Sequence, residues 1–470
     1  MTAIQTPFGS SAGKYAFLGT AKLKNCFAEL RNDGGKAKYV IVPSDGTTLF
    51  SEVTDTPCRG AAYYDDLDKA YSVHSGRVYS VVSAGTKTSL GVVPGQDKVR
   101  IVRNQKTTPQ IMIHASTGVY MIESGAVSKI ISDSLFTDAT LVDIAVFDGY
   151  TVYCYSDGRF LISSLNESTT IDPLDFATAE SSPDGMVACY VLGDMLLLFG
   201  TKTIEPWRNT GDPDFPLTPM PSVIPCGCLS KWSIAPLDNS LAFIANDGIV
   251  KRLAGLGAPT RISDHEVERL IQGEADPSVI EAQSWSRAGH AFYELKGTTW
   301  SKVYDANTQQ WHDRETYAET VWRHNNAFAA WNKTYVGDRL TGNLYYMDAT
   351  VHTEASGIQV STIRFPPLQS FGNGFILDAL HLDFLTGQGV LSPTALGYDP
   401  LLMLRISKDG GNSIVFERHL KTGKRGAYGR VTTRRLGKCG PQGAVFELAM
   451  SDPVGRALAL ADVEVRPLHR

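Results

Sequence analysis

The sequence predicts an all-β protein. We expect a β-propeller of six or seven irregular blades, preceded by an N-terminal arm or platform and followed by a C-terminal β-sandwich. Strand–turn–strand units recur roughly every 40 to 50 residues, the length of a four-stranded blade. Only residues 264–272 show a fair helical spacing of apolar residues. The 43 glycines supply turns between many short strands.

Composition excludes several classes of protein. The 470 residues carry a formal net charge of −5 and 43% hydrophobic residues, which argues against disorder and against a general nucleic-acid binder. No apolar run approaches the roughly 18 residues of a transmembrane helix, and the first 20 residues lack the apolar core of a signal peptide. We therefore expect no membrane partner. Seven cysteines, an odd number, favour folding in a reducing cytoplasm.

The first two predicted parts of the chain are residues 1–56, the N-terminal arm or platform, and residues 57–350, the propeller. The arm precedes the first repeat and contains a turn at Pro43–Gly46. Hairpin turns that need positive φ favour Asp-Gly, Ser-Gly or Thr-Gly, and such turns recur along the second part. The turn markers are Gly76, Gly118, Gly158, Thr201, Gly248, Gly297 and Gly342. Their spacing does not decide between six and seven blades.

The third part, residues 351–470, loses the repeat but keeps the alternation of apolar and polar residues that is typical of strands. About 115 residues of this kind are enough for a compact β-sandwich. The expected strands are residues 378–384, 401–406, 413–418, 444–450 and 457–465.

Motifs that carry catalysis are missing from the sequence. It contains no Gly-x-Ser-x-Gly, no phosphate-binding Gly-x-x-x-x-Gly-Lys-Ser/Thr and no His-Glu-x-x-His. We therefore predict no catalytic residues, no metal, no cofactor and no enzyme activity. Cys226 and Cys228 form the only close cysteine pair, and no second pair follows at zinc-like spacing. A buried turn is the simpler interpretation of this pair.

One segment has an unusual charge. Residues 401–440 contain ten basic and two acidic side chains, so the rest of the chain is strongly acidic. Such a block can contact phosphates or an acidic protein surface, and a solvated strand face is equally compatible with it. The candidate contact residues are Arg418, Lys421, Arg425, Arg434 and Arg435.

Several motifs together resemble a known family. The most specific is Thr203-Ile204-Glu205-Pro206-Trp207-Arg208, inside the longer segment Gly200–Asp212. The others are Ser181–Gly185, Pro225–Cys228, Asp247-Gly248, Arg261–Glu268, Asn25–Glu29, Pro43–Gly46, Arg59-Gly60, Ser407–Gly411 and Arg434–Gly437. Their order and spacing resemble the tail-hub proteins of short-tailed bacteriophages, also called packaged-DNA-stabilisation or head-completion proteins.

The resemblance implies a structural virion protein that is assembled in the host cytoplasm and located in the tail. Copies would form a ring, expected to be a hexamer, below the portal and its adaptor ring. The ring would continue the DNA channel, retain the packaged DNA, and dock the tail needle or plug and the tail spikes or fibres. It would make only transient, non-specific contact with passing double-stranded DNA. We expect Glu205, Trp207 and Arg208 at an assembly or partner contact, although a buried Trp with a local ion pair is the alternative.

The alternative function is a carbohydrate-binding or glycosidase-type β-propeller acting on host-surface glycans. Ser407–Ser413 resembles the Asp box of sialidase propellers, a tight turn whose Asp and Ser side chains bond the backbone. The aromatic stretch from Trp311 to Trp331 could offer a ligand site, whereas packing between blades is the other interpretation.

Overall fold

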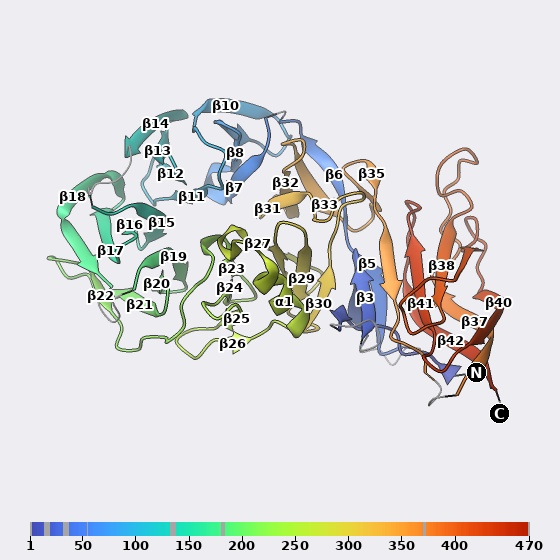
Figure 1. The fold of residues 1–470 in the computed structure, drawn as a ribbon. Helices are drawn as coiled ribbons and strands as arrows, with labels where there is room; N and C mark the ends of the chain where they lie inside the picture. The colour runs from blue at the N-terminus through green and yellow to red at the C-terminus, as the bar shows by residue number, and fades with distance from the viewer. Residues whose placement is uncertain are drawn as a thin grey trace.

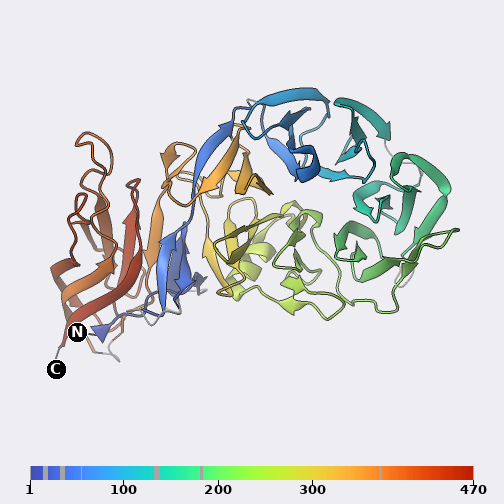
Figure 2. The ribbon, with the colours of Figure 1, turned by 180° about the vertical axis from the view of Figure 1, so that it is seen from behind.

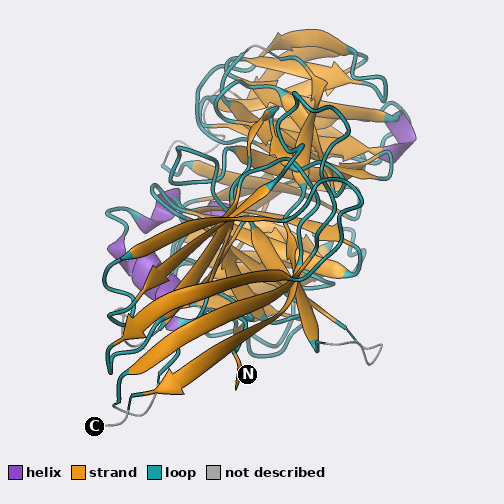
Figure 3. Cartoon of the chain, turned by 90° about the vertical axis from the view of Figure 1, so that its right-hand side faces the viewer, coloured by secondary structure: helices purple, strands orange, loops and turns teal. Residues whose placement is uncertain are grey.

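The computed structural model describes residues 2–13, 19–31, 37–53, 55–131, 138–179, 184–369 and 373–468. The molecule is elongated. A ring of small sheets forms one end, and two larger sheets packed together form the other (Figures 1 and 2). Figure 3 shows how few helical turns accompany the strands. The all-β prediction is confirmed.

The ring is a β-propeller, and the described residues form seven antiparallel four-stranded blades. Blade one is β7 (Cys58–Tyr64), β8 (Lys69–His74), β9 (Arg77–Val81) and β10 (Lys87–Val92). Blade two is β11 (Arg100–Arg103), β12 (Ile111–Ala115), β13 (Gly118–Glu123) and β14 (Ala126–Ile131). Blade three is β15 (Leu141–Phe147), β16 (Tyr150–Tyr155), β17 (Arg159–Ser164) and β18 (Glu167–Thr178). Blade four is β19 (Met186–Leu192), β20 (Met195–Gly200), β21 (Ile204–Asn209) and β22 (Leu217–Pro219).

The remaining blades follow the same order, with one exception. Blade five is β23 (Ala235–Pro236), β24 (Leu241–Ile244), β25 (Val250–Leu253) and β26 (Thr260–Arg261). Blade six is β27 (Glu281–Arg287), β28 (His290–Lys296), β29 (Ser301–Asp305) and β30 (Gln310–Asp313). Blade seven is β31 (His324–Ala330), β32 (Lys333–Asp338), β33 (Leu344–Asp348) and, from the start of the chain, β6 (Gly46–Ser51). First strands of neighbouring blades touch from blade one to blade four and from blade five to blade seven, and β31 contacts β7 to close the ring.

The predicted turn markers all fall at the same place in their blades. Each of the seven lies in or beside the turn between the second and third strands. Gly158 and Gly248 have φ of 93° and 76°, the left-handed region in which glycine costs least. The marker spacing therefore reports the blade period directly, and the described blades number seven rather than six.

The N-terminal segment is not a separate arm, because its strands pair with strands of the propeller and of the C-terminal sheets. Strand β6 pairs with β33, with Thr47 opposite Met347, and so completes blade seven with residues from the other end of the propeller sequence. The strands β1 (Thr2–Ala3), β2 (Ser11–Ala12), β3 (Thr20–Lys24), β4 (Cys26–Leu30) and β5 (Tyr39–Pro43) join the C-terminal sheets instead. The boundary expected at residue 56 thus differs from the sheet pairing, since residues 46–51 belong to the propeller.

The far end of the molecule is a two-sheet sandwich. Its strands after the propeller are β36 (Ser361–Arg364), β37 (Phe375–Phe384), β38 (Leu401–Ser407), β39 (Phe416–Lys421), β40 (Val431–Cys439), β41 (Val445–Met450) and β42 (Leu458–Pro467). One sheet runs β4-β5-β42-β37-β40, and the other runs β3-β36-β41-β38-β39. Alternate side chains from both sheets, such as Leu380 and Leu404, meet in one buried core.

The second sandwich sheet is continuous with blade six, because β3 pairs with β30 at Lys24 and Asp313. Asp313 also receives a hydrogen bond from the Ser10 hydroxyl (2.7 Å) and an ion pair from Lys302 (3.0 Å). These contacts fix the sandwich to the propeller through the N-terminal strands. A two-stranded ribbon, β34 (Thr353–Glu354) and β35 (Gly357–Ile358), connects the two parts along the chain.

The described residues contain one α-helix, α1 (His265–Gly273), close to the predicted range. The Asp264 side chain caps it by accepting a hydrogen bond from the Val267 backbone N–H at 2.8 Å. Val267 and Ile271 are fully buried. The described residues also include three 3₁₀ turns: η2 (Asp65–Leu67), η3 (Lys231–Ser233) and η4 (Pro277–Val279).

Candidate assembly surfaces

The basic block of residues 401–440 lies at the end of the sandwich farthest from the propeller (Figure 1). It covers β39 and β40, which are the last strands of their two sheets. Arg418 links these strands, because its Nη1 donates to Thr433 Oγ1 (2.6 Å) and to the Arg434 carbonyl (2.9 Å). Arg418, which the sequence places at a partner contact, therefore uses some of its N–H donors for hydrogen bonds within the chain.

The other predicted basic residues differ in how they are neutralised. Lys421 forms an ion pair with Asp399 at 2.7 Å. Arg425, Arg434 and Arg435 are exposed, and none forms an ion pair among the described residues. We call the exposed cations of this region that form no ion pair among the described residues the basic edge: Lys424, Arg425, Arg434, Arg435 and Lys438. The structure therefore brings three of the five predicted cations to one open surface.

Two connections project together beside the basic edge, namely residues 385–400 and residues 422–430. They are joined by hydrogen bonds from Gly387 N to Thr422 O (3.0 Å) and from Gly426 N to Gly387 O (3.1 Å). Their side chains include large apolar groups in solvent: Leu391 is 74% exposed, Leu396 64% and Tyr428 79%. Exposed apolar groups next to unpaired charges are typical of contact surfaces.

The structure separates the second predicted group, Glu205, Trp207 and Arg208. Glu205 and Trp207 are buried on β21, whereas Arg208 is exposed on the same strand. Trp207 packs edge-on against Phe160 of blade three, with ring centroids 4.9 Å apart. Trp207 therefore fills the core between blades three and four, and the expectation of a partner contact does not fit its position.

Blades three and four are strongly acidic, a feature that the sequence interpretation missed. Residues 138–219 contain thirteen acidic and three basic side chains. In an antiparallel blade, the turn after the first strand and the turn after the third strand emerge on the same face. Asp148, Asp194, Asp212 and Asp214 lie in or beside such turns and are exposed. We call these four residues the acidic face; counting charges blade by blade would have found it.

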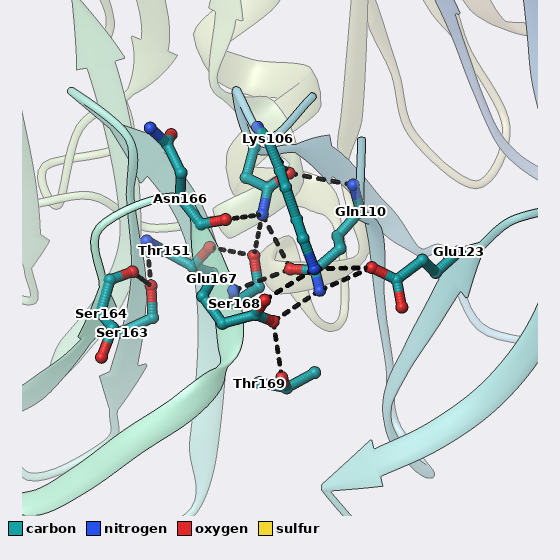
Figure 4. A network of polar contacts seen from close by, with 11 residues as sticks. Lys106, Gln110, Glu123, Thr151, Ser163, Ser164, Asn166, Glu167, Ser168 and Thr169 are labelled. Atoms are coloured by element: carbon teal, nitrogen blue, oxygen red, sulfur yellow. Dashed lines mark hydrogen bonds and ion pairs between the residues drawn. The ribbon is translucent and has the colours of Figure 1, made fainter. Parts of the chain in front are cut away.

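A network of hydrogen bonds and ion pairs lies beside this face (Figure 4). Lys106 of blade two donates to Glu123 (2.8 Å) and to Glu167 of blade three (2.7 Å). Gln110 reaches the same two carboxylates. Hydrogen bonds lower the pKa of Glu167 to about 2, and the one from Lys106 contributes most. Glu123 and Glu167 are thus already paired and are not part of the acidic face.

Side chains from several blades meet at the propeller axis. Lys98 forms an ion pair with Glu281 of blade six at 3.0 Å, and Arg100 of blade two pairs with Asp143 of blade three at 3.1 Å. Blades two and six are not neighbours in the ring, so the first of these pairs spans its centre. Lys98, Arg100 and Lys231 also lie over the Trp232 ring, at 5.5, 5.4 and 4.6 Å from its centroid. This cluster of charges and one aromatic ring lies at the axis.

The features that suggested a carbohydrate site have structural roles. Trp311, Trp322 and His324 are buried in the cores of blades six and seven. Asp409 accepts hydrogen bonds from the Ser413 N–H (2.9 Å) and from the hydroxyls of Ser407 and Ser413 (both 2.6 Å), as expected for a tight turn. A groove of about 720 Å³ does lie on the outer face of the second sandwich sheet, but its lining mixes both charges.

Cys226 and Cys228 are buried free thiols, and burial raises the pKa of Cys228 to about 12. In the described ranges, no three His, Cys, Asp or Glu side chains gather as they would around a metal ion. No helix in these ranges is long and apolar enough to cross a membrane. Of the residues behind the family resemblance, Ser181–Pro183 lie outside the described part of the chain.

The fold and these surfaces define a structural β-propeller protein with a β-sandwich attached. The family model described as "Bacteriophage P22 Gp10, beta-propeller", a phage stabilisation family, matches residues 4–352. The chain belongs to this family of bacteriophage packaged-DNA-stabilisation proteins. The match ends before the sandwich strands from β36 onward, so it does not reach the basic edge.

Several solved structures resemble part of this chain at low sequence identity. The BamB protein from Moraxella catarrhalis is 10% identical, with a TM-score of 0.41, over 70% of this chain and 98% of that one. The computationally designed Ika8 protein is 13% identical, with a TM-score of 0.39, over 68% and 96%. The BBS1N chain solved in complex with ARL6DN is 11% identical, with a TM-score of 0.40, over 64% and 96%. Scores this low carry no argument. No curated protein matches the chain significantly.

Proposed function

We propose that this chain is a tail-hub, or head-completion, protein of a short-tailed phage virion. Copies form a ring, proposed to be a hexamer, below the portal and its adaptor ring. The ring continues the DNA channel, retains the packaged genome, and docks the tail needle and the tail spikes or fibres. The observation that carries this proposal is the family match across the whole propeller.

Two features of the chain support a structural role. The half-buried Lys98–Glu281 ion pair crosses the propeller axis beside Trp232, so DNA would have to pass through the opening between copies. The charged surfaces lie on the outside of the molecule, where neighbouring proteins meet it. The glycan-binding alternative gains no support, because Trp311 and Trp322 are buried.

The experiment uses phage heads that were packaged in the absence of this chain. Purified protein is added, and the DNA that remains protected from nuclease is measured. Restored protection supports the proposal. Heads that keep their DNA without the chain, or that fail to bind it, would place its role outside head completion. Heads given an unrelated propeller protein serve as the control.

A further inference from the structure

The two most strongly charged regions of this chain have opposite signs and lie at opposite ends of the molecule. Residues 401–440 contain ten basic and two acidic side chains, and residues 138–219 contain three basic and thirteen acidic ones. In Figure 1 the strands β18 and β22 mark one extreme of the molecule, and β40 marks the other. This separation allows one copy to present each sign to a different neighbour.

On both surfaces some charges are left without ion pairs inside the described chain. Arg434 and Arg435 of the basic edge are exposed, and so are Asp194 and Asp214 of the acidic face. Charges that are neutralised internally, such as Lys421 by Asp399, are not counted here. Unpaired surface charges of opposite sign steer association and fix the orientation of the partners.

Each surface also offers apolar area. Leu391 and Tyr428 project beside the basic edge, at 74% and 79% exposure. Leu165, in the third turn of blade three and on the face that carries the Asp residues, is 58% exposed. Contact between such groups supplies the water-excluding core that charge pairs alone do not provide.

Symmetry decides how two copies can use these surfaces. A two-fold contact of each patch with its own copy would place like charges together, and an antiparallel dimer that joins the basic edge to the acidic face twice would use both surfaces of each copy and could not extend into a ring. A head-to-tail contact places opposite charges together, and it generates a ring when the rotation closes. We propose that the basic edge of one copy binds the acidic face of blades three and four on the next copy. This inference rests on the proposed function, to which it adds the surfaces that meet.

The test uses two charge-reversed chains. One carries Arg434→Glu and Arg435→Glu, and the other carries Asp194→Lys and Asp214→Lys. A control chain carries Lys69→Glu and Arg77→Glu, two exposed cations of blade one that match the first variant in charge change. Circular dichroism and thermal melts verify that each variant folds. Association is measured by sedimentation velocity in low salt, and by the number of copies retained per head.

Each reversed chain alone should associate about tenfold or more weakly than the wild type, while the control should not change. An equimolar mixture of the two reversed chains should regain pairwise association, because the unaltered basic edge of the Asp194→Lys, Asp214→Lys chain meets the unaltered acidic face of the Arg434→Glu, Arg435→Glu chain. Raising the salt from about 0.1 M to about 1 M should weaken the wild-type contact, since the Debye length falls from about 10 Å to about 3 Å.

The inference is overturned if the reversed chains assemble like the wild type, if their mixture does not recover, or if the wild-type chain stays monomeric both in solution and on heads. Its failure is distinguishable from failure of the proposed function. Heads that retain DNA with either reversed chain would leave the hub role intact and remove only this interface. Charge-dependent association without any DNA retention would support this interface and contradict the hub role.

Discussion

At the scale of single residues, the position of a side chain in the fold decides whether it packs in the core or is open to a partner protein. Trp207 and Arg208 are adjacent in the sequence, yet Trp207 is 5% exposed against Phe160 and Arg208 faces solvent. The family resemblance placed both at a partner contact, with a buried Trp as the alternative. The alternation of side chains along a strand explains the outcome, because neighbouring residues point to opposite faces.

Replacement of Trp207 should therefore affect folding before assembly. Trp207→Ala should lower the free energy of unfolding by about 3–5 kcal/mol, because it leaves a cavity between blades three and four. Arg208→Ala should stay within about 0.5 kcal/mol of wild type. Urea denaturation measures both. A Trp207→Ala chain with wild-type stability that fails to assemble would restore the contact role.

The buried Asp143 predicts a pH dependence of stability. Burial alone would raise its pKa, but Arg100 and Lys231 outweigh burial and hold the pKa at about 2. The pKa of an Asp in the unfolded chain is about 3.9, so the ionised Asp143 favours the folded form above that pH. This stabilisation should be lost as pH falls from about 4 to about 2.

The variant Asp143→Asn tests the same ion pairs. It leaves the cations Arg100 and Lys231 largely buried without their counter-charge, which should cost about 3–5 kcal/mol at pH 7. Between pH 4 and pH 2, its melting temperature should fall less than that of the wild type. Equal slopes of melting temperature against pH would show that Asp143 contributes nothing at the axis.

At the scale of elements, local turn chemistry was readable and long-range pairing was not. Four of the seven markers, Gly118, Gly158, Gly248 and Gly342, have positive φ, a local preference for glycine that can be read from the sequence whatever the tertiary fold. The pairing of β6 with β33 depends on closing a ring across most of the chain, and no local pattern reports that. The strand β40 does not follow from the sequence pattern, because its charged residues and the polar Thr433 interrupt the apolar alternation that predicts a strand.

The closing strand β6 is anchored by Thr47. Its hydroxyl is within 3.1 Å of His324 Nε2 and accepts a hydrogen bond from the Ala355 N–H at 2.9 Å. Thr47→Val keeps the shape but leaves these buried groups unpaired, which should cost about 1–3 kcal/mol. Thr48→Val, at the half-buried neighbouring position, is the matched control and should be nearly neutral. Thermal melts of the two variants should differ, and equal melts would contradict the anchoring role.

At the scale of the whole molecule, the acidic residues are spread along the sequence, whereas many of the basic residues are concentrated in one segment. The sequence showed the basic block, but the acidic residues that balance it are scattered over turns of two blades. Only the fold gathers Asp148, Asp194, Asp212 and Asp214 onto one face. A surface formed by turns from separate strands has no contiguous motif: counting charges blade by blade shows the acidic excess in the sequence, but the fold is needed to show which of these residues share a face.

The overall charge of −5 predicts weak binding of free protein to double-stranded DNA. Each phosphate neutralised by a cation adds salt-dependent affinity, and a conduit should let DNA pass. A filter-binding assay at about 0.15 M salt should show no nanomolar complex. Tight binding that falls steeply with salt would contradict a channel wall and would indicate a DNA-anchoring role.

The most direct measurement is an electron cryo-microscopy reconstruction of heads completed with purified protein. The account predicts a ring of density below the portal and its adaptor, into which the propeller and sandwich fit with copies placed head to tail. Density elsewhere on the particle, or single copies without contact between neighbours, would contradict the central claim that this chain forms the hub that closes the DNA-filled head.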